Sequence, residues 1–311
     1  MRSLDPDAVR GWAGELAERG HQPTRIASGV EGAVFRLGNG AVAKVWNSRT
    51  EAEIDRLARF YRAVAAAGLP FRTPQIHDVG HLSDAVFSIE RELPGDPLWP
   101  DHTGQSPPLD PKRIRCVADV LAALATVTPT DDMALLPVLD EPEPLRLERG
   151  FDRALADLVV RRVERSLEHA SVAVPDIGAR AAALADRLSA SDTSHVGLIH
   201  GDLIPANILV DEHGEVTAVL DFGFFSTVGP PAFDAAVTVN VFDMYGPARD
   251  ASRAAMTELI QQAFGYPREV LAGYLAAYAM ATMTMFGTSE ADGHFRWCAE
   301  VLRRPDVLAV L

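Results

Sequence analysis

Cysteine is scarce in this sequence, and so is lysine. The 311 residues include only two cysteines, Cys116 and Cys298, which lie far apart and form no CxxC pair. This scarcity argues against a disulfide framework or a cysteine-based zinc site, and it favours the cytoplasm as the compartment. Of the 29 basic residues, only Lys44 and Lys112 are lysines.

Lys44 lies within the apolar segment AVAKVW, in a chain whose usual cation is arginine. An ammonium group is a compact point charge, whereas a guanidinium group is a wide planar fork. The sequence therefore indicates that position 44 requires the smaller cation.

Long apolar runs and a positive net charge are also missing. No stretch reaches the roughly 18–20 apolar residues that cross a bilayer. The first residues, MRSLDPDAVRGWAGEL, contain no apolar segment after a basic one, so no secretory signal is expected. The net charge of −14 argues against nucleic acid or an anionic membrane as a partner.

The acidic excess is uneven along the chain. Residues 1–97 hold 12 basic and 13 acidic side chains, and the remaining residues hold 17 and 30. One interpretation is a solvated acidic surface that keeps the protein soluble. The other is an acidic field that attracts a cationic small molecule, and both fit the sequence.

Hydrophobic periodicity predicts an α+β fold with two lobes. A helix is expected over 5–20, three short strands over 24–46, a helix over 50–67, and two more strands before residue 93. Dense proline then marks a boundary between an N-terminal lobe, 1–93, and a C-terminal lobe, 94–311. The second lobe is expected to contain one strand pair, NILVDEHGEVTAVLDF, among helices at 111–127, 145–168, 175–190, 231–245, 249–263, 267–286 and 290–304.

Polar residues interrupt the apolar runs of HGDLIPANILVDEHGEVTAVLDFG, at the ends of expected strands. Asp221 and Asn207 offer the carboxylate and amide oxygens that hold Mg²⁺. Asp202 can accept a hydrogen bond from an attacking hydroxyl group, while Lys44 can neutralise phosphate. His200 is expected to brace the loop. Each residue alone has a structural explanation as a turn, a cap or a strand-edge side chain, but their order and spacing favour phosphoryl transfer.

From about residue 24 to the C-terminus, the sequence resembles the aminoglycoside phosphotransferase-like family, the small-molecule relatives of protein kinases. HGDLIPANILV and VLDFG carry the resemblance, together with VGPPAFDAAV. In that last segment Asp234 occupies the family's structural aspartate position. The resemblance implies a bilobal protein-kinase-like fold, ATP (or GTP) and Mg²⁺ as cofactors, and Asp202 as the catalytic residue.

Further site residues follow from the same resemblance. IERELPGDPLW is similar to the interlobe segment that binds adenine, which implies contacts from the Arg91 carbonyl and the Leu93 N–H. SGVEG is similar to the hairpin loop over the nucleotide phosphates, which implies roles for Ser28, Gly29 and Gly32. A glutamate of the helix 50–67 should hold Lys44. Glu51 and Glu53 are candidates, and the helical face favours Glu53.

Three departures separate the sequence from the family pattern. Ile204 and Ala206 replace a histidine and a glycine of the catalytic loop, and Gly229-Pro230-Pro231 replaces GDP. A Leu-His pair common in the second lobe is absent from VLAALATV. None of these changes alters the residues expected to handle phosphate, although they loosen the assignment to a substrate branch.

Three functions fit these residues. The first is an ATP- and magnesium-dependent kinase, monomeric or homodimeric, acting on a hydroxyl group of a cationic small molecule such as an aminoglycoside, a related antibiotic or an amino sugar. The second is a metabolic kinase for an uncharged acceptor, and the third an inactive nucleotide-binding module. The acceptor site could draw acidic side chains from 131–143, Asp152 or Asp157. The methionine-rich segment YAMATMTMFG is expected to pack in the core.

Overall fold

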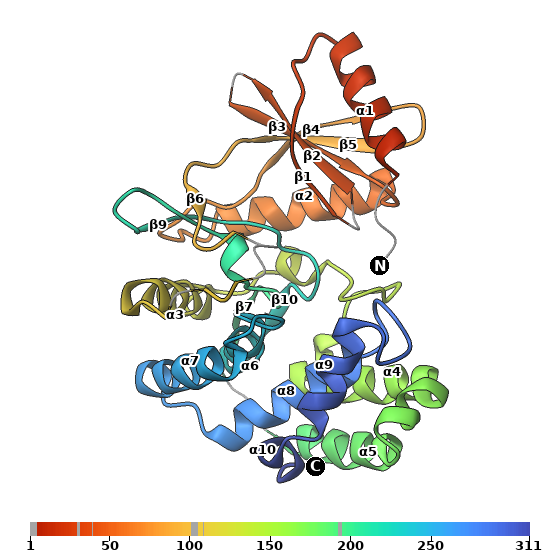
Figure 1. Cartoon of the computed structure of the whole chain (residues 1–311), viewed down its shortest axis with the longest axis vertical. Helices are drawn as coiled ribbons and strands as arrows, with labels where there is room; N and C mark the ends of the chain where they lie inside the picture. Colours follow the sequence, from red (N-terminus) through yellow and green to blue (C-terminus); the bar gives the residue numbers. More distant parts are fainter. Residues whose placement is uncertain (1–4, 30–31, 39, 101–104, 108, 192–194) are drawn as a thin grey trace.

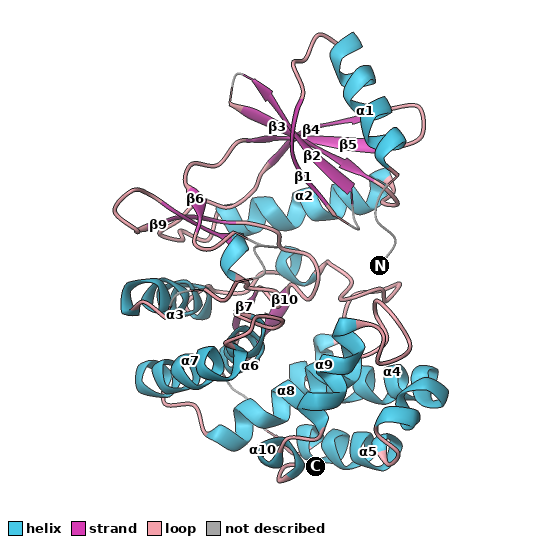
Figure 2. Ribbon diagram, viewed as in Figure 1, coloured by secondary structure: helices cyan, strands magenta, loops and turns pink. Residues whose placement is uncertain are grey.

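In the computed structural model, a small mixed lobe lies above a larger helical lobe (Figure 1). The structure describes residues 5–29, 32–38, 40–100, 105–107, 109–191 and 195–311. The strands of the first lobe form one fanned sheet, and helices dominate the second lobe (Figure 2). This arrangement confirms the predicted α+β, protein-kinase-like fold class.

The sheet of the first lobe is antiparallel, and its strands follow the chain order except that β5 lies between β3 and β4. Its order is β1-β2-β3-β5-β4, and every neighbouring pair is antiparallel. The strands span Thr24–Ser28 (β1), Gly32–Gly38 (β2), Ala41–Trp46 (β3), Ile76–His81 (β4) and Val86–Arg91 (β5). Because side chains alternate along a strand, Val45 and Trp46 of β3 point to opposite faces of the sheet.

Two helices cover these two faces. Helix α1, Pro6–Glu18, begins at the N-cap Asp5 and packs Val9, Trp12 and Leu16 against the face that carries Val45. Helix α2, Glu51–Ala65, lies on the side of Trp46. The two apolar clusters are separate, and only the cluster of α2 continues into the second lobe.

Helix α2 therefore connects the sheet to the catalytic region. Its N-terminus is a capping box in which Thr50 and Glu53 exchange side-chain and backbone hydrogen bonds. On its buried face, Phe60 packs against Phe222 at a ring distance of 5.9 Å. The Tyr61 hydroxyl donates to the Phe222 carbonyl at 3.4 Å. The residue after Asp221 is thus fixed by α2.

The second lobe contains two small antiparallel sheets of short strands. Strand β6, Asp96–Pro97, pairs with β8, Ile208–Val210, and β8 pairs with β9, Val216–Val219. A second pair joins β7, Gly197–Ile199, to β10, Thr227–Gly229. The hairpin β8–β9 was expected from the sequence, whereas β6 and β10 were not, because two- and three-residue strands show no periodicity.

Helices form the rest of the second lobe. They span Pro111–Ala125 (α3), Phe151–Ala173 (α4), Ile177–Ser189 (α5), Pro231–Val241 (α6), Arg249–Phe264 (α7), Arg268–Thr282 (α8), Gly293–Leu302 (α9) and Pro305–Leu308 (α10). Met280 and Met283 are buried in the core, as expected. No helix in the described part of the chain combines the length and hydropathy that crossing a bilayer requires.

The predicted bounds of α4 were wrong at both ends. It begins at Phe151 instead of residue 145, because the preceding residues form a 3₁₀ turn, Leu147–Arg149, and Gly150 has a φ of 87°. It continues past residue 168 because Ala170 and Ala173 pack in the core.

Candidate active site

The loop between β7 and β8 is held by one buried carboxylate. Asp234, near the start of α6, accepts the backbone N–H of His200 at 2.9 Å and that of Gly201 at 2.8 Å. Gly201 has a φ of 76°, and a Cβ there would lie 2.4 Å from the Phe225 Cβ, so only glycine fits. Burial raises the pKa of Asp234, and the nearby His200 and the two N–H groups oppose that rise.

The His200 imidazole links this loop to the strand end that carries Asp221. Its Nε2 lies 2.8 Å from the Leu220 carbonyl, and its Nδ1 accepts the Asp202 N–H at 3.2 Å. Since a carbonyl only accepts, the proton is on Nε2. Burial lowers the pKa of His200, which favours this neutral form. Through these two contacts His200 connects the loop to the end of β9, and its bracing role stays a prediction.

Asp221 lies at the junction of the two lobes. The Lys44 ammonium, on β3, donates to its Oδ1 at 2.9 Å. The charge of Lys44 is the main cause that holds the pKa of Asp221 below its usual range, against the effect of desolvation. Asp221 has a φ of 60°, a left-handed conformation that aspartate tolerates better than most residues. Such conformations concentrate at functional sites.

Asn207 is buried beside the same loop. Its Nδ2 donates to the Asp202 carbonyl at 3.0 Å, and its own backbone carbonyl accepts the Leu220 N–H at 2.8 Å. The amide nitrogen is therefore committed to the loop, which leaves the amide oxygen as the acceptor of that side chain. An amide oxygen and a carboxylate, as Asn207 and Asp221 offer, are the kinds of ligand that suit a hard divalent cation.

The predicted phosphate loop connects β1 and β2. Gly29 N–H donates to the Gly32 carbonyl at 2.9 Å, so this loop closes at its base. A Cβ on Gly32 would lie 1.8 Å from the Val45 carbonyl oxygen, which explains the glycine. Ser28 is exposed at the end of β1. Val30 and Glu31, at the tip, lie outside the described residues.

Neither candidate glutamate of α2 contacts Lys44 in the part of the chain that the structure describes. The Glu53 carboxylate accepts hydrogen bonds from the Thr50 backbone and hydroxyl, each at 2.7 Å, and these bonds are the main causes that lower the pKa of Glu53. Glu51 lies 3.3 Å from His81. The pairing of Lys44 with Glu53 stays a prediction.

The surroundings of Lys44 contain residues that sequence reasoning missed. Its ammonium lies 4.3 Å from the centre of the Trp46 ring, and the Trp46 indole donates to Ser88 at 3.1 Å. Ser88 in turn donates to Glu90 at 3.2 Å. The signal was present in the sequence, because Ser88 and Glu90 are polar residues, two apart, within the otherwise apolar strand VFSIER.

The expected adenine-binding segment follows β5. Arg91 and Leu93 line a cavity of about 260 Å³ together with residues from the end of α2 and from the segment before β4. The Glu92 N–H donates to the Gly40 carbonyl at 2.9 Å, which ties this segment to the turn between β2 and β3. Backbone contacts from Arg91 and Leu93 to a nucleotide stay a prediction.

Residues 23–282 match the model of the phosphotransferase enzyme family. The chain belongs to this family. Since the match covers most of the chain, it includes both the lysine of β3 and the catalytic loop. No curated protein sequence matches.

Three solved structures show the extent of the likeness in fold. The aminoglycoside phosphotransferase APH(3'')-Id from Streptomyces rimosus is 17% identical, with a TM-score of 0.57, over 89% of this chain and 98% of that one. The macrolide 2'-phosphotransferase MphH from Brachybacterium faecium is 19% identical, with a TM-score of 0.56, over 96% and 99%. A GDP complex of an aminoglycoside 2'-phosphotransferase-IIIa variant is 16% identical, with a TM-score of 0.58, over 95% and 94%.

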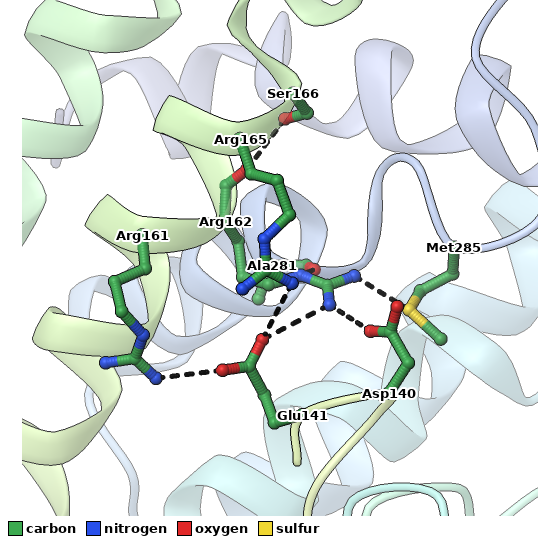
Figure 3. A network of polar contacts seen from close by, with 8 residues as sticks. All are labelled: Asp140, Glu141, Arg161, Arg162, Arg165, Ser166, Ala281 and Met285. Carbon is green, nitrogen blue, oxygen red and sulfur yellow. Dashed lines mark hydrogen bonds and ion pairs between the residues drawn. The ribbon is translucent and has the colours of Figure 1, made fainter.

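In this phosphotransferase three of the candidate acidic side chains for an acceptor, Asp132, Asp140 and Glu141, pair with arginines. Figure 3 shows Asp140 and Glu141 facing the arginines of α4. Glu141 lies 3.1 Å from Arg161, 3.4 Å from Arg162 and 3.2 Å from Arg165. Arg162 also contacts Asp140 and Met285. This cluster uses its acidic charge internally.

The other acidic candidates differ in their surroundings. Asp132 pairs with Arg59 of α2 at 2.6 Å. Asp152 is buried and accepts the Tyr274 hydroxyl at 2.7 Å. Asp157 is exposed on α4.

A row of ring side chains, in contrast, runs from the segment after Asp221 to α9. Phe224, three residues after Asp221, stacks on Phe286 at 6.2 Å. Phe286 contacts the His294 ring at 5.1 Å, and the Tyr245 hydroxyl lies 3.3 Å from His294 Nδ1. Desolvation of the hydroxyl group raises the pKa of Tyr245, with smaller contributions from the charges of Cys298, Asp292 and Asp202, although the side chain as a whole is exposed.

Proposed function

We propose that this phosphotransferase transfers the γ-phosphoryl group of ATP to a hydroxyl group of a small cationic molecule. The contact that supports this most is the 2.9 Å hydrogen bond between Lys44 and Asp221. It brings a phosphate-binding cation of one lobe to a metal-binding carboxylate of the other. Asp202 and Asn207 lie on the loop that His200 ties to the residue before Asp221.

Each residue has a distinct part in the proposed reaction. Lys44 neutralises phosphate oxygens, and the loop of Ser28, Gly29 and Gly32 covers them. Asp202 accepts a hydrogen bond from the acceptor hydroxyl, orients it for in-line attack, and takes its proton. His200 and Asp234 keep that carboxylate in place without entering the chemistry.

Asp221 and Asn207 are the residues that would hold Mg²⁺. Their oxygens fit a hard cation, because the Asn207 nitrogen is already bound to the loop. When bound, the metal supplies charge neutralisation along the phosphate chain. The Arg91 carbonyl and the Leu93 N–H would bind the base of ATP, with GTP as the other possible donor.

The cationic nature of the acceptor rests on two observations. The protein carries a net charge of −14. In addition, the exposed rings of Tyr245 and Phe286 can hold an ammonium group through cation–π contacts. Aminoglycosides, other cationic antibiotics and amino sugars meet this description, and phosphorylation of such antibiotics would confer resistance.

An uncharged metabolite is the second candidate. The pairing of Asp132, Asp140 and Glu141 with arginines favours it, because these three carboxylates are not free to bind a cationic acceptor. The two candidates differ in their response to salt. The KM of a cationic acceptor should rise with ionic strength, whereas that of a neutral acceptor should not change.

The deciding experiment measures ADP release from ATP and magnesium with a panel of aminoglycosides, macrolides, amino sugars and neutral metabolites. Acceptor-dependent release by the wild type, reduced about 10²–10⁴-fold in Asp202→Asn, is expected from loss of a general base. Equal turnover in the variant would contradict the role of Asp202. Nucleotide binding without turnover across the panel would favour a regulatory module instead.

A further inference from the structure

One face of the sheet in the first lobe carries a buried line of polar side chains. Strand register pairs Lys44 with Ser88, and Val42 with Glu90. Paired residues point to the same side of a sheet, as do residues two apart in a strand. Lys44, Trp46, Ser88 and Glu90 therefore share one face, and the contact with Asp221 shows that it is the face toward the second lobe.

The hydrogen bonds along this line run in one direction. The Trp46 indole N–H donates to Ser88 Oγ at 3.1 Å, and the Ser88 hydroxyl donates to Glu90 Oε1 at 3.2 Å. Trp46 is 1%, Ser88 0% and Glu90 8% exposed. Because an indole N–H can only donate, the direction of this chain is fixed, and it fixes the plane of the Trp46 ring.

That ring is a support for Lys44. The ammonium lies 4.3 Å from the ring centre, and the Arg49 guanidinium lies 4.9 Å from it. A cation over an indole face is attracted by the negative face of the ring. A tilt of the ring would move the ammonium relative to Asp221, so the orientation of Trp46 bears on the charge that faces the nucleotide phosphates.

Among the described residues, both candidate glutamates of α2 have partners other than Lys44. Glu53 is occupied by Thr50, and Glu51 by His81. Glu90 lies within the field of Lys44: desolvation raises the pKa of Glu90, and the Lys44 charge is the largest opposing cause. The environment of Lys44 thus includes a carboxyl group of β5.

We propose that Trp46, Ser88 and Glu90 are the positioning residues of Lys44, and that they fix its ammonium for phosphate binding through the orientation of the Trp46 ring. This inference rests on the proposed function, in which Lys44 binds nucleotide phosphate. It differs from the expected support by a helix glutamate, because all three residues belong to β3 and β5.

The scarcity of lysine allows a direct test. With only Lys44 and Lys112 in the chain, biosynthetic labelling with ¹³C,¹⁵N-lysine gives two sets of side-chain NMR signals. Lys112→Arg assigns them, and Lys112 serves as the internal control in every other sample. The Trp46 ring current should displace the Lys44 Hε signal upfield in the wild-type protein.

Three variants test the separate hydrogen bonds between Trp46, Ser88 and Glu90. Ser88→Ala removes the link and should reduce the Lys44 displacement, while Ser88→Thr keeps a hydroxyl group and should restore it. Trp46→Phe keeps a ring but loses the donor, so it should resemble Ser88→Ala. Unchanged Lys44 signals in folded Ser88→Ala and Trp46→Phe would overturn the proposal, whatever the enzyme does.

Kinetics provide the second measurement. In Ser88→Ala, kcat/KM for ATP should fall about fivefold, because the variant loses the hydroxyl group that links the Trp46 indole to Glu90. The KM of the acceptor should not change, because the chain lies on the nucleotide side. An NMR response together with absent turnover across the acceptor panel would keep the positioning of Lys44 and reject the proposed function. The opposite result, turnover with no NMR response, would reject only the positioning.

Discussion

Lys44 and Asp221 are 177 positions apart in the chain, yet a 2.9 Å hydrogen bond joins them across the two lobes. Lys44 comes from the middle of the first sheet, and Asp221 follows β9 of the second lobe. Their contact joins the two halves of the proposed site and gives the lysine charge a partner in the second lobe.

Replacement of this ammonium should impair phosphate handling without unfolding the protein. In Lys44→Met, kcat/KM for ATP should fall by about 10²-fold or more, the usual effect of removing a preorganised charge donor. Steady-state kinetics with the acceptor found in the panel measure the loss. Lys112→Met, an exposed lysine of α3, is the control and should retain full activity. Retained activity in Lys44→Met would contradict the role given to the lysine.

Removal of the buried acceptor at Asp234 should loosen the catalytic loop. Asp234→Asn replaces one of two accepting oxygens by a donor, which leaves an N–H of His200 or Gly201 unpaired. The expected loss is about 1–3 kcal/mol in the free energy of unfolding, together with a fall in kcat. Urea denaturation and kinetics measure both.

Asp243→Asn is the matched control, since Asp243 is also buried but accepts from Ser252 at 2.8 Å. It should lose stability without a comparable fall in kcat. An equal fall in kcat for both variants would mean that Asp234 acts through general stability and not through the loop.

The glycine at the base of the phosphate loop should be intolerant of any side chain. In Gly32→Ala the Cβ would meet the Val45 carbonyl oxygen at 1.8 Å, so β2 and β3 must separate. We expect a loss of about 3 kcal/mol in the free energy of unfolding and a higher KM for ATP. At Gly38 the φ is 77°, a left-handed conformation, but a Cβ there would meet no atom within 4 Å, so Gly38→Ala should cost only about 1 kcal/mol. Similar losses in both would exclude the clash as the cause.

The free energy of unfolding should decrease as the pH falls, because His294 is buried in its neutral form. Burial lowers the pKa of His294 to about 4, whereas an unfolded imidazole titrates near 6.5. Between these values the unfolded chain binds the proton and the folded protein does not. Stability is therefore full above about pH 6.5 and decreases as the pH falls toward 4, by up to about 3 kcal/mol from this residue.

Urea denaturation near neutral pH and near pH 5 tests this prediction. His294→Gln keeps a polar side chain but removes the titration, so its pH dependence should be shallower than that of the wild type. His200, which is also buried with a lowered pKa, contributes in the same direction to both proteins. The same pH dependence in the two proteins would show that His294 does not contribute.

The arginine cluster of Figure 3 predicts unequal roles for two neighbouring acids. Glu141 is buried among three arginines, so Glu141→Gln leaves buried positive charge and should cost about 3–5 kcal/mol. The Asp140 side chain is 62% exposed, and Asp140→Asn should cost less than about 1 kcal/mol. Thermal unfolding compares them. A larger loss for Asp140 would mean that Arg162 depends on the exposed partner.

Local patterns in the sequence predict the secondary structure well where caps and periodicity coincide. Helix α2 shows this, because Ile54, Leu57, Tyr61 and Val64 lie at helical spacing and are all buried. The bounds of α4 were less predictable, since its start depends on the conformation of Gly150 and its end on packing against other helices. Strands of two or three residues, such as β6, depend on pairing partners that no local pattern reveals.

The candidate site shows the same limit. Asp202, Asn207 and Asp221 belong to one continuous segment, and Asp234 follows it closely, so a motif could identify them. The glutamate expected to hold Lys44 could not be identified in this way. The helical face favoured Glu53, but Thr50 and Glu53 also form the T-x-x-E signature of a capping box, which competes for the same carboxylate. The pairing of Glu141 with three arginines of α4 depends on tertiary packing alone.

Helix α2 belongs to the first lobe by sequence and to the second by packing. Its buried face shares one apolar core with the helical lobe, whereas α1 and the opposite face of the sheet form a cluster of their own. A fragment ending at residue 93 would therefore expose Phe60 and Tyr61 to water. A chimera with a relative should exchange the strands and α1 but keep α2 with the helical lobe, because Phe60 and Tyr61 of α2 contact Phe222 there.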